Sequence, residues 1–504
     1  MIERARALKS DPWFALLRTL SCLAASWYVA AYLYIACSRI DYAYDLEWME
    51  GGMLEHVARV IEGKPLYVEP SIDFTPYIYA PFYYWLSALF VQIIGLGLPA
   101  LRAVSLLSSL GVFFFIYQIV RNSTGFRHCG WIAIGLFAAM FVIGGAWFDI
   151  ARVDSLYLCI LMAAVWLLYR GDRTELVAGI LLGVAFLTKQ TALLMAVPLC
   201  LARLLGVPGW RRLYCTLGFV AVAGGSAVIL NSQSDGWFFY YLFELPSSHK
   251  MLWQDASAFW RFDIFIHLPF ICSLAFFPLL RRDKARVVLI HWASCVGFVA
   301  AAWSSRMHIG GFRNVVMPAY LFLSWSAAET IGIWWLFARS RNGLKSEIVS
   351  LTRALSAFAY LLCISQFAVL WYPIRPHLPT AADRAVGDEL VKLIAEFDGP
   401  VLVPFHGHLA RLAGKEPHGH QMGFMDVYNG KETGPKEAVG RSIRAALESA
   451  RYAAVVVDEK WWPDALNPHY RKERGHLISP KNTFWPKTGK RVRPLWLYIR
   501  RKNR

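Results

Sequence analysis

The sequence predicts an α-helical protein that crosses a membrane many times and ends in a small α/β domain outside the membrane. Apolar residues make up 57% of the 504 residues and charged residues only 17%, which is more apolar surface than a soluble globule of this size can bury. Long apolar runs alternate with short basic clusters over most of the chain. The last stretch, from about residue 373, shows shorter helix-like and strand-like patterns instead. An ordinary soluble enzyme is therefore excluded.

The charge distribution supports a membrane protein and argues against nucleic-acid binding. The chain carries 52 Lys and Arg against 35 Asp and Glu, a formal net charge of +17. A nucleic-acid-binding protein gathers such charge on one patch, whereas here it recurs in clusters between apolar runs. The positive-inside rule assigns these clusters to the cytoplasm together with the N-terminus.

Apolar runs of spanning or near-spanning length predict the helices of the membrane part, at 13–37, 81–97, 99–120, 129–148, 155–169, 175–188, 191–205, 213–231, 263–280, 287–303, 315–338 and 350–372. If every run crossed the membrane, the basic clusters from Arg121 onward would all face outward. They face the cytoplasm only if one of the early runs does not cross. The run at 81–97 is short, starts with proline and has Tyr83, Tyr84 and Trp85 at its head, which favours an interfacial or re-entrant helix. We therefore expect about eleven crossings, with the N-terminus in the cytoplasm and the C-terminus outside.

Two domains follow from this topology, a transmembrane domain over 1–372 and an extracytoplasmic α/β domain over 373–504. The transmembrane domain has a long first outer loop over 38–98. Shorter outer loops are expected around 149–155, 232–262 and 304–314. Helix-like segments in the tail alternate with the strand-like PVLVPF, YAAVVVD and LWLYIR, as in a small α/β domain.

Acidic residues gather at two of these outer loops. Asp45, Glu47 and Glu50 follow the first helix, and a short amphipathic helix is expected from Leu54 to Ile61. Asp149 and Asp154 flank Arg152 in the next outer loop. Such residues either form a solvated acidic surface or converge in a reaction centre. The second interpretation is favoured because ionisable groups at the ends of membrane helices are costly unless they face a cavity. In a reaction centre, one carboxylate can take a proton from an attacking hydroxyl while the other orients it.

Cationic residues lie on the same predicted side of the membrane. Lys189 falls between two apolar runs, and a later loop carries Arg306, His308, Arg313 and Asn314 beside the pair Gly310–Gly311. A snorkelling lysine and contacts with lipid headgroups are the simple explanations. The functional explanation is that these residues bind the phosphate group of a membrane lipid, because lysine and arginine bind phosphate well.

These motifs, in this order, resemble those of the GT-C glycosyltransferases over roughly residues 1–320. The similar branch comprises the protein O-mannosyltransferases, the aminoarabinose transferases and the Rgt-type galacturonosyltransferases. The resemblance rests on the acidic pair of the first loop, G-x-x-L-Y (Gly63, Leu66, Tyr67), Y-x-P-x-Y-Y-W (Tyr79, Pro81, Tyr83, Tyr84, Trp85), A-R-x-D (Ala151, Arg152, Asp154), L-T-K (Leu187, Thr188, Lys189) and G-G-x-x-N-x-x-x-P (Gly310, Gly311, Asn314, Pro318).

The resemblance implies sugar transfer from a polyprenyl-phosphate donor, with inversion, to a lipid, glycan or protein hydroxyl on the extracytoplasmic face. Asp45, aligned with the family's leading acid, or Glu47 would be the general base, with Asp154 in support. The donor phosphate would contact Lys189, Arg306, Arg313 and His308. A weaker substrate-binding set comprises Glu50, Arg152, Tyr79, Tyr83 and Asn314.

The sequence departs from the family pattern in two places. Leu46 separates the two first-loop acids, which are adjacent in the family, so the choice of base stays open. Tyr79 and Ala80 stand where some members carry a lysine.

No cofactor is required by this scheme, although a divalent metal is possible. The two HGH pairs of the tail, His406/His408 and His418/His420, have a spacing that can bind zinc, but loop histidines beside glycine explain them more simply. The rival to a membrane transferase is a lipid or polysaccharide transporter. Transporters usually have repeated halves with ionisable groups at the midplane, and this chain has neither pattern. The expected location is the inner, or plasma, membrane, with the C-terminal domain in the periplasm.

Overall fold

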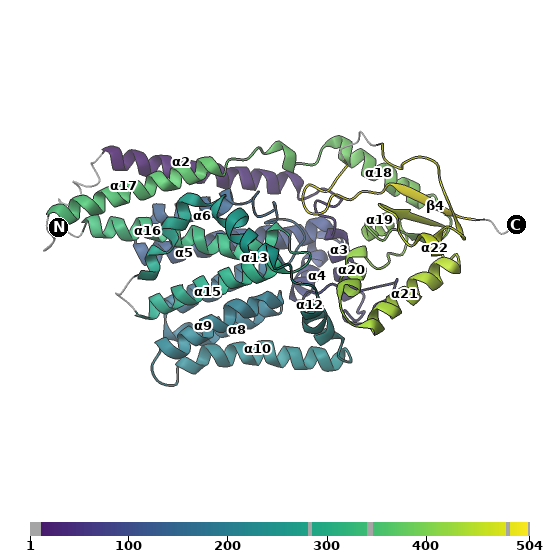
Figure 1. The fold of residues 1–504 in the computed structure, drawn as a ribbon, viewed down its shortest axis with the longest axis horizontal. Helices are drawn as coiled ribbons and strands as arrows, with labels where there is room; N and C mark the ends of the chain where they lie inside the picture. The colour runs from purple at the N-terminus through teal and green to yellow at the C-terminus, as the bar shows by residue number, and fades with distance from the viewer. Residues whose placement is uncertain (1–11, 281–284, 340–345, 480–483, 502–504) are drawn as a thin grey trace.

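The computed structural model describes residues 12–280, 285–339, 346–479 and 484–501. It is mostly helical, and its long helices run roughly along one axis of the molecule (Figure 1). Within the described residues, five helices are long and apolar enough to cross a membrane, or six if one bent pair counts as a single span. The five belong to α2 (Pro12–Arg39), α5 (Leu98–Thr124), α10 (Arg212–Gln233), α15 (Ala285–Met307) and α17 (Ser346–Val369).

Other helices pack between these long ones. They are α6 (Arg127–Ala139), α7 (Asp154–Arg170), α8 (Glu175–Phe186), α9 (Leu193–Gly206), α14 (Pro269–Ala275) and α16 (Met317–Arg339). The 12 residues of α8 rise about 18 Å, well short of a hydrocarbon core of about 30 Å. The expected total of about eleven crossings therefore stays a prediction. Residues 281–284 and 340–345 lie outside the described residues; they include the basic residues Arg281, Arg282, Lys284, Arg341 and Lys345.

The apolar run at 263–280 is not the straight helix that its hydropathy predicts. Two helical pieces, Gln254–Phe265 and Pro269–Leu280, meet there at 97°. The break has a local cause. A π-helical segment, Phe259–Phe265, ends just before Pro269, which begins α14 and cannot continue the preceding hydrogen-bond pattern.

The run at 81–97 forms α4 (Phe82–Ile94), whose 13 residues span about 20 Å. It packs against α5 and against α3 (Glu50–Ile61), which includes the helix expected from Leu54. Tyr83 and Tyr84 are buried, while Trp85 and Ile93 are exposed on the other side. The length suits an interfacial helix, and the expectation that it does not cross stays a prediction.

The C-terminal region, residues 373–501, contains a four-stranded sheet with strand order β1-β2-β4-β3. The β1/β2 pair is parallel, with Val401 opposite Ala454, and the other two pairs are antiparallel. Its elements are α18 (Ala381–Ala395), β1 (Val401–Leu402), α19 (Gly407–Leu412), α20 (Gln421–Asn429), α21 (Thr433–Glu448), β2 (Ala454–Val457), α22 (Pro463–Leu466), β3 (Tyr470–Lys472) and β4 (Trp496–Arg500). The apolar patterns predicted β1, β2 and β4, but the Tyr-Arg-Lys sequence of β3 has no such pattern.

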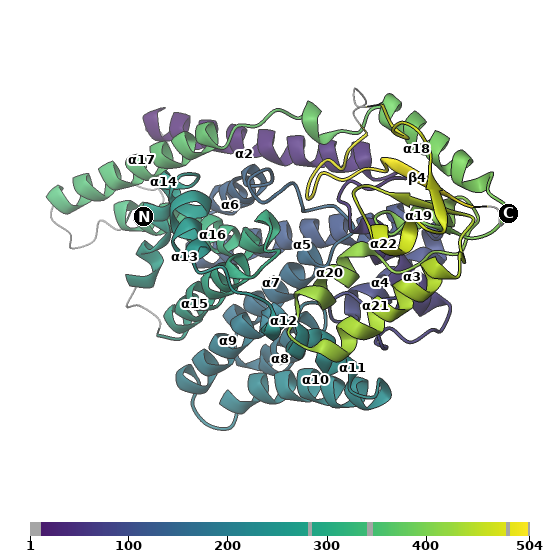
Figure 2. The same cartoon turned by 45° about the vertical axis from the view of Figure 1, so that its right-hand side comes forward.

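The C-terminal region covers one end of the helical part, next to α3 and α4 (Figures 1 and 2). It contacts the first loop, which in the structure comprises residues 40–81 between α2 and α4, through side-chain and backbone groups. Arg411 of α19 pairs with Glu55 of α3 at 2.6 Å. The backbone N–H of Thr488 donates to the carbonyl of Leu46 at 3.0 Å. The acidic part of the first loop is therefore enclosed between the helical part and the C-terminal region.

Candidate active site

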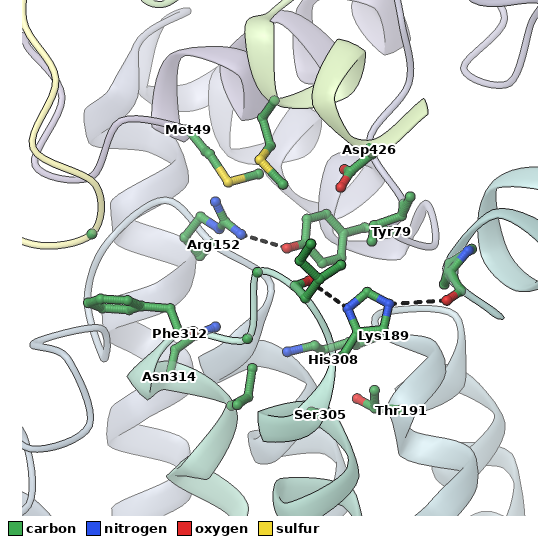
Figure 3. A pocket seen from close by; sticks show the side chains of 18 of the residues that line it. Met49, Tyr79, Arg152, Lys189, Thr191, Ser305, His308, Phe312, Asn314 and Asp426 are labelled. Atoms are coloured by element: carbon green, nitrogen blue, oxygen red, sulfur yellow. Dashed lines mark hydrogen bonds between the residues drawn. The ribbon is translucent and has the colours of Figure 1, made fainter. Parts of the chain in front are cut away.

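A cavity of about 540 Å³ lies where the helical part, the first loop and the C-terminal region meet (Figure 3). Six residues expected from the sequence line it: Glu47, Tyr79, Arg152, Lys189, His308 and Asn314. They come from distant parts of the chain and are brought together by the ends of several helices. The convergence that the sequence motifs suggested is therefore present for these six side chains.

Glu47 is the first-loop carboxylate that reaches the cavity. Its side chain is 1% exposed, and its Oε2 accepts a hydrogen bond from Arg152 Nη1 at 2.9 Å. Arg152 Nη2 in turn donates to the Tyr79 hydroxyl at 2.6 Å (Figure 3). Burial raises the pKa of Glu47 to about 8, although the positive charge of Arg152 acts in the opposite direction. Glu47 can therefore exchange a proton near neutral pH.

A backbone approach from the C-terminal region fixes Glu47 in place. Gly489 has a φ of 76°, in the left-handed region that glycine tolerates. A Cβ atom at this position would lie 2.8 Å from both Cγ and Oε1 of Glu47. Gly489 thus lets the chain pass close beside the carboxylate, and the next residue, Lys490, reaches the cavity wall.

Glu50 belongs to the framework of the first loop rather than to the cavity lining. Its two carboxylate oxygens accept hydrogen bonds from Arg102 at 2.9 and 2.6 Å. They also accept from the backbone N–H groups of Leu46 and Ala151, each at 2.7 Å. Glu50 therefore ties the loop that carries Glu47 to the loop that carries Arg152.

Asp154 lies at the start of α7, directly behind the lining. Its Oδ1 accepts from Lys189 Nζ at 2.7 Å and from Asn314 Nδ2 at 3.1 Å. Its Oδ2 accepts from Trp147 Nε1 at 3.0 Å. All three partners line the cavity, whereas Asp154 itself does not. The arrangement holds the Lys189 ammonium group and the Asn314 amide at the cavity wall.

Asp45, the other acid expected as a possible base, lies outside the cavity lining. Its Oδ2 accepts from His406 Nδ1 at 2.8 Å, and the opposite nitrogen of that ring, Nε2, donates to Asp458 Oδ2 at 2.9 Å. Burial alone would lower the pKa of His406, but Asp458 and Asp45 on its two sides raise it to about 10. The result is a buried imidazolium between two carboxylates, which joins the first loop to the C-terminal region.

The cationic residues of the loop expected at 304–314 fall into two groups, one at the cavity and one outside it. His308 lines the cavity, where its two ring nitrogens lie 2.8 and 3.1 Å from the backbone oxygens of Ile309 and Pro246. Arg306 lies outside the lining and pairs with Asp263 at 2.9 Å. Arg313 is exposed and also lies outside the lining. Of the four cations expected at the donor phosphate, Lys189 and His308 reach the cavity.

Tyr83 and the tail histidines have other surroundings. The Tyr83 hydroxyl donates to the carbonyl of Leu101 at 2.9 Å, away from the cavity. His420 Nε2 lies 3.1 Å from the carbonyl oxygen of Trp48 and thus also joins the C-terminal region to the first loop. In the part of the chain that the structure describes, no group of three or more His, Cys, Asp or Glu side chains is placed to hold a metal ion.

Sequence reasoning missed several lining residues. Met422, Met425 and Asp426 of α20 and Lys490 beyond Gly489 come from the C-terminal region, and Trp147 comes from the loop before α7. The KTGK sequence at 487–490 carries a turn signal through its glycine. Nothing in the sequence around Asp426 distinguishes it from an ordinary helical residue.

Comparisons with known proteins agree with this architecture. Residues 78–233 match the family model described as dolichyl-phosphate-mannose-protein mannosyltransferase. The fold matches the crystal structure of ArnT from Cupriavidus metallidurans bound to undecaprenyl phosphate, with a TM-score of 0.56 at 13% identity. The apo structure of the same ArnT gives a TM-score of 0.57, also at 13% identity. Each match covers 94% of this chain and 97% of the ArnT chain. The predicted resemblance to the GT-C glycosyltransferases is confirmed.

The family model covers only part of the candidate active site. The family model spans the segment that contains Tyr79, Arg152, Asp154 and Lys189, whereas Glu47 and the C-terminal region lie outside it. Among curated proteins, no sequence matches the chain significantly. At 13% identity the likeness to ArnT shows the fold and not the substrate.

Proposed function

We propose that the chain is an integral-membrane glycosyltransferase that moves a sugar from a polyprenyl-phosphate donor to a hydroxyl group of a lipid, glycan or protein, with inversion. One observation carries the proposal: a single cavity is lined by the buried carboxylate of Glu47 and by the ammonium group of Lys189. These are the two charges that transfer from a sugar phosphate needs, a proton acceptor for the attacking hydroxyl and a cation for the departing phosphate.

In the proposed reaction, Glu47 accepts the proton of the acceptor hydroxyl while that oxygen forms a bond to the anomeric carbon of the donor sugar. The bond between the anomeric carbon and the phosphate oxygen breaks, and its electron pair stays on the phosphate. Attack opposite to the leaving phosphate inverts the configuration. Lys189, held by Asp154 at 2.7 Å, faces the charge that develops on the phosphate.

This assignment chooses between the two acids that the sequence left open. Glu47 lines the cavity and Asp45 does not, so Glu47 is the proposed base. Asp154 and Glu50 are positioning residues: the first holds Lys189 and the second holds the first loop. The donor assignment is supported by the similar fold of ArnT, whose crystal structure contains undecaprenyl phosphate. The proposed location is the inner membrane, with the cavity on the extracytoplasmic side.

The test compares lipids and glycans from cells that lack the protein with those from cells complemented by the wild type or by Glu47→Gln. We expect one glycoconjugate to lose one sugar in the deletion strain and to regain it only with the wild type. A transporter without chemistry of its own would be restored by Glu47→Gln as well. Equal restoration by both chains, with both present at the same level in the membrane, would overturn the proposal.

A further inference from the structure

Helix α20, together with Gly489 and Lys490, forms the part of the cavity wall that the C-terminal region contributes. Met422, Met425 and Asp426 lie three and four residues apart along this helix, so they occupy one face, and all three line the cavity. In Figure 3 the Asp426 carboxyl lies at the cavity, next to Tyr79. The opposite wall carries Lys189 and Asn314 from the helical part.

The carboxyl group of Asp426 faces the cavity (Figure 3) without a protein partner. Asp426 is 4% exposed, and among the described residues no hydrogen bond or ion pair reaches its side chain. Its backbone oxygen, by contrast, lies 2.8 Å from His249 Nε2. Burial raises the pKa of the Asp426 carboxyl to about 8, although Arg152 acts in the opposite direction. The carboxyl oxygens open onto the cavity, so a ligand that displaces water there can form hydrogen bonds with them.

Charge decides which part of a sugar phosphate can approach this carboxyl. A phosphate group is attracted by Lys189 on the opposite wall, whereas the Asp426 carboxyl offers it no positive charge. The uncharged sugar hydroxyls are suited to Asp426, because a carboxyl group accepts two or more hydrogen bonds. Met422 and Met425 beside it offer flexible apolar surface to the C–H face of a sugar ring.

We propose that Asp426 is a specificity-determining residue that binds hydroxyl groups of the sugar held in the cavity. This inference rests on the proposed function and deepens it, since it assigns sugar recognition to the C-terminal region. The hydroxyls belong to the donor sugar or to a glycan acceptor, and the two arms of the experiment separate these sources.

The first arm measures binding to the full-length protein in detergent without acceptor. The probes are undecaprenyl phosphate and a panel of hexosyl and pentosyl undecaprenyl phosphates, and the sugar with the largest gain over undecaprenyl phosphate for the wild type is kept. Asp426→Asn and Asp426→Ala should bind undecaprenyl phosphate as the wild type does, but lose about 10–100-fold in affinity for the glycosylated lipid. Asp426→Asn has almost the same size and keeps the test valid if the alanine variant does not fold.

The control variant is Asp464→Asn, an exposed residue of α22 in the same region, which should bind every probe like the wild type. A deoxy-sugar series sharpens the result. The wild type should discriminate against the lipid that lacks the contacted hydroxyl, and both Asp426 variants should bind the deoxy and parent lipids alike.

The second arm locates the hydroxyl if donor binding is unchanged. Transfer is measured with a total lipid extract and a cell-envelope glycan fraction from the deletion strain as the acceptor sources. Half-saturation by the active source should then require about 10–100-fold more material for Asp426→Asn. Unchanged donor binding together with an unchanged acceptor requirement overturns the inference while leaving the transferase proposal intact. A wild type that binds none of the lipids and transfers no sugar overturns the proposed function, and the inference falls with it.

Discussion

The Nη1 atom of Arg152 lies 2.9 Å from Oε2 of Glu47, and both side chains are at most 3% exposed. This pair joins the two acidic motifs, although Arg152 follows Glu47 by 105 residues. Arg152 orients the Glu47 carboxylate through Nη1, while its Nη2 donates to the Tyr79 hydroxyl. The second carboxylate oxygen, Oε1, accepts no hydrogen bond from Arg152. That geometry suits a base that must receive a proton from a substrate.

The first prediction concerns the base itself. Glu47→Gln keeps the size of the side chain but cannot accept the proton, so kcat should fall by about 10²–10⁴-fold. Binding of undecaprenyl phosphate should remain near the wild-type level, because Lys189 is unchanged. The measurement is the initial rate of transfer with purified protein. Glu62→Gln, an exposed residue just beyond α3, is the matched control, and a Glu47→Gln variant as active as this control would exclude Glu47 as the base.

The second prediction concerns pH. A glutamate with its ordinary pKa is fully ionised above about pH 6, whereas burial raises the pKa of Glu47 to about 8. Since the base must be ionised, kcat/KM should rise from pH 6 to about pH 9 and level off above the raised pKa. Arg152→Gln removes the charge that lowers this pKa, so the rise should move to higher pH. A wild-type profile that is flat from pH 6 to 9 would contradict the raised pKa.

The sequence predicted which residues can meet, because helix ends on one side of a membrane protein share a surface. Asp154, Lys189 and Asn314 were expected near the outer boundary, and the structure joins them by hydrogen bonds of 2.7 and 3.1 Å. The sequence does not determine the direction of each acid in Asp45-Leu46-Glu47. Asp45 is turned away from the cavity by His406, which lies 361 residues later in the chain.

Other features depend equally on long-range packing. Asp426 lies in a helix of the C-terminal region, and its contribution to the cavity exists only because α20 packs against the helical part. The 97° bend between Gln254–Phe265 and Pro269–Leu280 is marked in the sequence only by Pro269. Hydropathy measures apolar length and not helix direction, so it predicted one straight run there.

The third prediction concerns the donor phosphate. Lys189→Ala removes the ammonium group from the cavity wall and should weaken the binding of undecaprenyl phosphate by about 10–100-fold. Arg306→Ala should have a smaller effect, because Arg306 lies outside the lining, where it pairs with Asp263. Binding is measured in detergent, with Lys64→Ala, an exposed lysine paired with Glu62, as the control. Equal binding by Lys189→Ala and this control would show that Lys189 is only the structural partner of Asp154.

The fourth prediction concerns topology. A reporter fused after Arg173, between α7 and α8, should be cytoplasmic, and one fused after Thr380, just before α18, should be extracytoplasmic. Reversed locations would mean that α4 crosses the membrane. Two reporters on the same side would instead mean that an odd number of the later expected spans fails to cross. The bent pair is the first candidate, because its two pieces meet at 97°.

The last prediction concerns the contact that joins the first loop to the C-terminal region. In His406→Gln the two buried carboxylates of Asp45 and Asp458 lose the imidazolium between them, and removal of one partner from a buried ion pair costs about 3–5 kcal/mol. The thermal midpoint of the full-length protein in detergent should therefore fall. Transfer activity should fall as well, because Glu47 lies two residues after Asp45 in the same loop.

The pH dependence distinguishes this ion pair from simple packing. The pKa of His406 is raised from 6.5 to about 10 in the folded protein, so its contribution to stability is complete below about pH 6.5 and is lost as the pH rises through about 10. The wild type should therefore lose part of its stability between pH 7 and 10, and His406→Gln should not lose that part. His476→Gln, an exposed histidine of the same region, should follow the wild type. Parallel stability curves for the wild type and His406→Gln over this range would show that His406 packs there without its charge.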